Sequence, residues 1–199
     1  MAKKVNHEER KLEIAKRALR LFSQVGYENV SLMMIAAATG ISRTVLYRYF
    51  CSKREVMDAS IKTVTDQIEA ECKDVIASRV SAIERLEKVC HKVVDVMFKN
   101  REFVIAVFDF VIGMVRTGAN MSQGIAEYTA GTRSAIKMLV EHAKRRGELP
   151  EVLIVDRISD AIYAEFESCA MRIVLGTEHD SSAAKVRFSD ILRAISIWK

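Results

Sequence analysis

Apolar residues recur at spacings of three and four along most of the chain, which is the periodicity of amphipathic helices. The pattern first appears over residues 8–25. A second, short helix is expected after Ser31 and should end at Gly40, because glycine readily takes the left-handed conformation that closes helices. A third helix is expected over residues 43–50, where Ser42 can cap its first turn. The N-terminal part therefore predicts a unit of three short helices.

The same periodicity continues to the C-terminus and predicts six further helices. Their expected ranges are 54–77, 81–98, 101–116, 121–146, 156–175 and 187–198. One proline and eight glycines among 199 residues leave little room for β-turns or long linkers. The sequence thus predicts an all-α protein of about nine helices, with an N-terminal three-helix domain (1–53) and a C-terminal helical domain (54–199).

The third predicted helix carries polar side chains on its outer side and no acidic residue interrupts them. The outward set is Arg43, Thr44, Tyr47, Arg48 and Tyr49. Two helices joined by a glycine turn, the second of them basic, match a helix-turn-helix that inserts its second helix into the major groove of DNA. Arg43, Thr44 and Arg48 are the candidates for reading bases, because arginine can donate two parallel bonds to guanine. The candidates for phosphate contacts are Ser31, Tyr47, Tyr49 and Lys53.

The charge distribution points independently to the same end of the chain. Residues 1–60 hold eleven Lys and Arg against six Asp and Glu, whereas residues 61–199 hold twenty of each kind. The whole formal net charge of +5 therefore lies in the N-terminal part. A basic end around a helix-turn-helix favours double-stranded DNA as the partner.

Four short motifs follow one another in this part of the chain. They are Phe22-x-x-x-Gly26-Tyr27, Ser31-x-x-x-Ile35-Ala36, Gly40-Ile41-Ser42 and Leu46-Tyr47-x-Tyr49-Phe50-x-x-Lys53. In order and spacing they resemble the N-terminal domain of the tetracycline-repressor (TetR) family. Met33 and Met34 depart from the polar or charged residues that this family often has there, and Cys51 replaces a common turn residue. The resemblance implies a ligand-responsive transcriptional regulator, a homodimeric repressor that a small-molecule effector releases from its operator.

By the same resemblance, the C-terminal domain should hold the effector between its helices. The candidate residues are Phe108, Asp109, Met114, Met121, Tyr128, Tyr163 and Phe166. Most aromatic and methionine side chains at helical spacing are expected to form core rather than pocket. Asp109 has two interpretations: it meets a cationic effector or pairs with Arg116, or it lies on an exposed helix edge.

The last two predicted helices are the candidates for dimerisation. Residues 156–175 are apolar on two sides, so two sides of that helix must be buried. The resemblance implies a four-helix arrangement shared by two subunits, with an interface formed by Ile158, Ile162, Phe166, Ile173, Phe188, Ile191, Leu192 and Ile195. The alternative is that these stripes close the core of one protomer. A two-fold dimer predicts a palindromic operator with half-sites about 10 to 10.5 bp apart, or a multiple of that distance.

Other classes of protein find little support in the sequence. Four cysteines without a C-x-x-C pair argue against a disulfide framework or a zinc site, and no nucleophile or phosphate-binding motif of an enzyme is present. We therefore expect neither catalysis nor a metal or cofactor. The apolar run 103–115 is too short to cross a membrane and the N-terminus lacks a signal peptide, so a cytoplasmic protein is expected. Two alternatives stay open: a redox-sensing regulator that uses the thiol of Cys51, and a helical interaction module that does not bind DNA.

Overall fold

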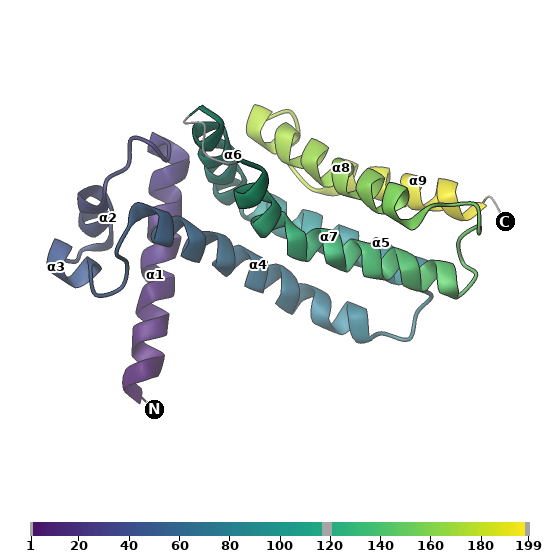
Figure 1. Ribbon diagram of the computed structural model, residues 1–199, viewed down its shortest axis with the longest axis horizontal. Coiled ribbons are helices and arrows are strands. Elements are labelled where there is room, and N and C mark those ends of the chain that lie inside the picture. The colour runs from purple at the N-terminus through teal and green to yellow at the C-terminus, as the bar shows by residue number, and fades with distance from the viewer. Residues whose placement is uncertain (1, 117–120, 198–199) are drawn as a thin grey trace. The chain divides into compact units, whose positions relative to one another are not determined.

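The computed structural model describes the backbone of residues 2–116 and 121–197, and the side chains of residues 7–116 and 130–196. All regular structure in this described part is helical, which confirms the predicted all-α class (Figure 1). Residues 2–116 and 121–197 form the helices α1 (Ala2–Val25), α2 (Leu32–Thr39), α3 (Arg43–Leu46), α4 (Lys53–Ala77), α5 (Ala82–Lys99), α6 (Arg101–Arg116), α7 (Met121–Arg145), α8 (Val155–Leu175) and α9 (Ser182–Ile197).

Three helices have bounds that differ from the prediction by several residues. α1 begins at Ala2, six residues before its predicted start. α3 ends at Leu46 rather than at residue 50, because the next backbone bonds tighten to a spacing of three, as in Tyr49 N–H to the carbonyl of Leu46 at 2.9 Å. α9 begins five residues earlier than predicted. Its first turn contains two alanines, which favour helix but add no large apolar signal, and the Asp180 carboxylate accepts the N–H of Ser182 at 2.8 Å.

The helices form two compact units. The first comprises Met1–Gln67 and Asn100–Met121, and the second comprises Ile68–Lys99 and Ser122–Lys199. In the first unit, α1 packs against α2 and α6, and α2 packs against α3. The fully buried large side chains of its core include Phe22, Ile35, Phe50 and Phe110. The three N-terminal helices therefore share their hydrophobic core with α6, which follows them in the sequence by more than fifty residues.

The second unit contains α5, α7, α8 and α9 together with the end of α4. α5 packs against both α8 and α9, and α8 and α9 lie side by side (Figure 1). The core includes Leu86, Ile162, Ile173 and Phe188, all exposed by at most 1%. The rings of Phe166 and Phe188 pack with their centroids 4.5 Å apart. Apolar packing between α5, α8 and α9 thus forms the centre of this unit.

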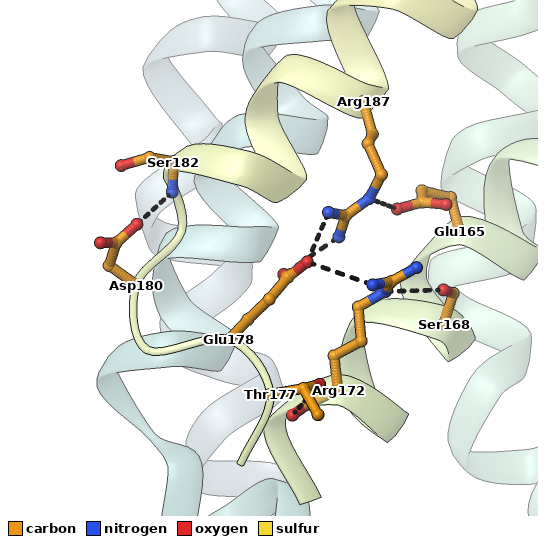
Figure 2. A network of polar contacts seen from close by, with 8 residues as sticks. All are labelled: Glu165, Ser168, Arg172, Thr177, Glu178, Asp180, Ser182 and Arg187. Atoms are coloured by element: carbon orange, nitrogen blue, oxygen red, sulfur yellow. Dashed lines mark hydrogen bonds and ion pairs between the residues drawn. The ribbon is translucent and has the colours of Figure 1, made fainter. Parts of the chain in front are cut away.

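A network of charged side chains joins α8, α9 and the loop between them (Figure 2). Arg187 of α9 donates to Glu165 of α8 at 2.6 Å and to Glu178 of the loop. Arg172, near the end of α8, lies 3.6 Å from the same Glu178 carboxylate. Both carboxylates are largely covered, so their pairing with arginine offsets the cost of removing them from water. The network fixes the register of α9 against α8.

Candidate nucleic-acid interface

Hydrogen bonds at both ends of the turn between α2 and α3 define its geometry. Ser31 caps α2 by accepting the N–H of Met34 at 3.2 Å, and Ser42 caps α3 by accepting the N–H of Val45 at 3.2 Å. Gly40 lies in the left-handed region, with φ 69°. The N–H groups of Gly40 and Ile41 then bond back to the carbonyls of α2 at 3.1 Å each, which is a Schellman motif. The caps and glycine turn expected from the sequence are therefore present.

α3 is held on the first unit by its inner side and exposes its outer side. Leu46 and Phe50 are fully buried. The exposed residues are Arg43, Thr44, Tyr47 and Arg48, while Tyr49 is half-buried. Only hydrogen-bond donors, hydroxyls and cationic groups project from the exposed side, as a helix in the major groove requires.

Arg43 and Tyr47 contact each other on this exposed side. The Arg43 Nη2 donates to the Tyr47 hydroxyl at 3.1 Å, and the guanidinium carbon lies 5.4 Å from the centre of the ring. The two residues are four positions apart, so they lie one above the other on the helix. This contact reduces the freedom of the arginine before any partner binds, which lowers the entropic cost of presenting its guanidinium.

The other predicted phosphate contacts have partners within the chain. The Tyr49 ring stacks on His7 of α1, with the centroids 4.6 Å apart. Lys53, at the start of α4, donates from Nζ to the carbonyls of Tyr27 at 2.7 Å and Glu28 at 3.1 Å. Its ammonium also lies 4.3 Å from the centre of the Tyr27 ring. Lys53 is thus directed at the turn after α1, a contact that the sequence motif did not indicate.

The predicted effector residues are divided between the two units. Phe108, Asp109 and Met114 belong to α6 in the first unit, whereas Tyr163 and Phe166 are buried in α8 in the second. The side chains of Met121 and Tyr128 lie outside the described residues. Arg133 stacks on the Tyr163 ring at 3.6 Å, and Phe166 packs on Phe188.

Asp109 lies on an exposed edge of α6, as one of its two interpretations predicted. Its Oδ2 accepts the backbone N–H of Tyr27 at 2.6 Å. The sequence gave no signal for this bond, because its two residues are 82 positions apart. The carboxylate therefore has a defined partner in the turn after α1.

A cleft of about 230 Å³ lies between α7 and α8 in the second unit. None of the predicted effector residues lines it, and the residues that do are Arg133, Ser134, Lys137, Asp156, Ser159 and Asp160. Its basic groups are already paired, Arg133 with Asp160 at 3.2 Å and Lys137 with Asp156 at 2.7 Å.

Five of the eight residues predicted at a dimer interface lie in the core of the protomer. They are Ile162, Phe166, Ile173, Phe188 and Leu192, all exposed by 6% or less. Their side chains are unavailable to a second copy. These five residues therefore agree with the alternative, in which the apolar stripes form the core of one protomer. Ile158, Ile191 and Ile195 are half-buried. A dimer surface on α8 and α9 therefore has to come mainly from other sides of these helices.

Three of the four cysteines, Cys72, Cys90 and Cys169, are buried, and Cys51 is exposed. Burial raises the pKa of the Cys169 thiol to about 11 and also raises that of Cys90. Within the described residues, no group of three or more His, Cys, Asp or Glu side chains is placed to hold a metal ion. The helices in this part of the chain include none that is long and apolar enough to cross a membrane.

Comparison with known proteins identifies relatives of the region that carries this interface. Residues 14–59 match the family model of bacterial regulatory proteins, tetR family. The HTH-type transcriptional regulator HbdR of Aromatoleum sp. (strain CIB) is 34% identical over 86 residues, which are 43% of this chain and 36% of HbdR. The chain thus spans little more than a third of this curated relative.

Solved structures resemble the fold over almost its whole length. A TetR-family transcriptional regulator from Rhodococcus sp. has a TM-score of 0.79 at 18% identity, and the match covers 95% of this chain and 99% of the other. The transcriptional regulator FadR from Bacillus subtilis, in complex with stearoyl-CoA, has a TM-score of 0.76 at 18% identity and covers 92% and 96%. At this identity the likeness concerns the fold.

Proposed function

We propose that the chain is a member of the tetR family of bacterial regulatory proteins, whose model matches residues 14–59, and that it is a ligand-responsive, DNA-binding transcriptional regulator. In the simplest form it is a homodimeric repressor that a small-molecule effector releases from a palindromic operator. Repression needs no further component, because a dimer seated on a promoter blocks access to it.

The observation that carries this proposal is the exposed side of α3. Arg43 and Thr44 of this short helix are exposed, and so are Tyr47 and Arg48 directly after it, while caps and buried residues fix its start, turn and inner side. Arg43 and Thr44 stand in the first turn, which is the part of a recognition helix that reaches base edges. The charge of residues 1–60 adds favourable, sequence-independent attraction to phosphates.

We place the dimer contact on the outward side of α8 and α9. Ala161, Ala164, Met171 and Leu175 follow one another along α8 at helical spacing, and all four are exposed. Val186 of α9 is also exposed, by 59%. Small residues allow close approach of helices, and the larger ones at one end supply apolar area to bury. Light scattering during size-exclusion chromatography tests this surface, and Leu175→Glu should convert a dimer into a monomer.

The effector is proposed to act through α4. This helix begins with Lys53 in the first unit and ends at Ala77 in the second, so a change in its position alters both units. A change in the separation of the two α3 helices in a dimer would spoil their fit to successive major grooves. Coupling of about 1 to 3 kcal/mol would weaken operator binding by about 5- to 150-fold. Long-chain acyl-CoA thioesters are the first compounds to test, because the FadR structure contains stearoyl-CoA.

Fluorescence anisotropy of the purified protein tests the proposed function. The probe is labelled DNA from immediately upstream of the reading frame, in about 150 mM salt with an excess of non-specific competitor. Saturable binding that an Arg43→Ala, Tyr47→Phe variant loses would support the proposal. If neither this DNA nor selection from a random pool yields a bound sequence with folded dimer, the protein is not a DNA-binding regulator, and the interaction module takes its place.

A further inference from the structure

The turn between α1 and α2 is held by charged groups on two sides. Gly26 ends α1 with φ +85°, and a Cβ at this position would lie 3.3 Å from Oδ2 of Asp109. That oxygen accepts the N–H of Tyr27 at 2.6 Å. The carbonyl of Tyr27 in turn accepts a bond from Lys53 at 2.7 Å, and so does the carbonyl of Glu28 at 3.1 Å. Asp109 from α6 and Lys53 from α4 therefore hold the N–H and the C=O of the same residue.

The side chain of Tyr27 is fixed as firmly as its backbone. Its ring is 9% exposed and lies with its centroid 4.6 Å from that of Phe110, in an edge-on arrangement. The ammonium of Lys53 covers the ring at 4.3 Å. Burial raises the pKa of the Tyr27 phenol, against the lowering effect of nearby Arg54. We call Asp109, Tyr27 and Lys53 together the turn clasp.

The turn clasp lies directly before the DNA-reading helices. Val30 is 2% exposed and bonds from its N–H to the Tyr27 carbonyl at 3.3 Å. The next residue, Ser31, is the cap of α2, and α2 packs on α3. A shift of Tyr27 therefore shifts the start of α2 and, through it, the helix that carries Arg43.

We propose that Asp109 is a positioning residue for DNA recognition, which acts with Lys53 through the turn clasp to hold α2 and α3 in the orientation that fits the major groove. This inference rests on the proposed function and deepens it. It assigns Asp109 to the turn rather than to an effector. It also assigns Lys53 to the same turn rather than to a phosphate. A displacement of α6 would break the 2.6 Å bond and weaken operator binding.

The first test compares Asp109→Ala with Glu102→Ala, a matched control on the same helix. Glu102 is exposed and pairs across 3.5 Å with Arg20, away from the turn. Both substitutions raise the net charge by the same amount, so general electrostatics predicts equal or tighter DNA binding for both. The turn clasp predicts that Asp109→Ala weakens operator binding by about tenfold or more while Glu102→Ala does not. Asp109→Asn should recover part of the loss, because an amide oxygen can still accept the Tyr27 N–H.

The second test uses Lys53→Met to separate the turn from a phosphate contact. A lost phosphate contact lowers the slope of log K against log [salt] by about 0.9 per site. The turn clasp predicts an unchanged slope, and a loss of affinity that is not additive with that of Asp109→Ala. Circular dichroism and light scattering on each variant establish that it is a folded protein of wild-type oligomeric state.

The outcomes separate the inference from the proposed function. If the wild-type protein binds no DNA, the proposed function is wrong. If the wild type binds its operator and folded Asp109→Ala binds equally well, the turn clasp does not position α2 and α3. A lower unfolding temperature with unchanged affinity would likewise overturn the inference, because it describes a residue that only stabilises the fold. A reduced salt slope for Lys53→Met, with losses of affinity that add to those of Asp109→Ala, would show that Lys53 contacts a phosphate instead.

Discussion

Arg43 offers the sharpest test of the proposal that α3 reads DNA. Arg43→Ala removes a guanidinium that is exposed, stands in the first turn of α3 and is held by the Tyr47 hydroxyl at 3.1 Å. No buried group loses a partner, so the free energy of unfolding should change by no more than about 0.5 kcal/mol. Any large change in DNA affinity then reports on the interface alone. Tyr47→Phe is the milder of the two substitutions, because it removes only the hydroxyl that orients the guanidinium.

The expected magnitudes differ between the two variants. A bidentate arginine–guanine pair is worth about 1 to 3 kcal/mol of discrimination, so two copies in a dimer give about 2 to 6 kcal/mol for Arg43→Ala. The Tyr47→Phe variant keeps the ring, whose centre lies 5.4 Å from the guanidinium carbon. Loss of one exposed hydrogen bond costs about 0.5 to 1 kcal/mol, or about 5- to 30-fold in operator affinity for the dimer. Arg43→Ala should therefore be the larger loss.

The assay is anisotropy on the operator and on duplexes in which single G·C pairs are replaced in both half-sites. One of these replacements should weaken binding of the wild-type protein far more than replacements of the neighbouring base pairs do. Arg43→Ala should lose that preference and bind the original and replaced duplexes equally. Equal losses for Arg43→Ala on every duplex, together with a lower salt slope, would refute base reading and make Arg43 a phosphate contact.

Three further predictions concern the second unit and the thiols. Phe188→Ala removes a fully buried ring that packs on another at 4.5 Å, and should lower the free energy of unfolding by about 3 to 5 kcal/mol in urea denaturation. In the native protein only Cys51 should react with a thiol reagent at mildly alkaline pH, because Cys169 has a pKa of about 11; reaction of more than one thiol before unfolding would contradict this. Burial opposes ionisation of Asp95, but hydrogen bonds from Lys185 and Ser181 outweigh it and hold the pKa below the ordinary 3.8. Asp95→Asn should therefore destabilise the protein above pH 3.8, and the difference in unfolding free energy should vanish as the pH falls through the lowered pKa.

Local signals in the sequence predicted the helices and most of the DNA-reading side. Caps at Ser31 and Ser42 and the left-handed Gly40 depend on residues a few positions apart, so they can be read from the chain. The length of α3 could not be read in this way. Its last turn tightens after Leu46, although the apolar spacing continues to Phe50.

Contacts between distant segments could not be predicted from the sequence. An apolar stripe shows that a side of a helix is buried but not what covers it, which is why Ile162 and Phe188 were assigned to a partner and lie in the protomer core. Asp109 was recognised as unusual because a carboxylate stood in an apolar run. Its partner, the N–H of Tyr27, depends on how α6 packs along α1, and no periodicity encodes that.

The small size of the proposed DNA-binding unit, α1 to α3, explains why we propose that its orientation depends on α6. Three short helices bury too little surface to be stable alone, since even domains of about 60 residues bury only about 60% of their unfolded surface. Phe110 of α6, 2% exposed, completes their core, but apolar contact is non-directional and leaves the turn free to slide. The bonds from Asp109 and Lys53 to Tyr27 are directional, so they fix the turn at one position. If these helices bind DNA as proposed, they need α6 both for their core and for their orientation, so a movement of α6 would change their fit to the major groove.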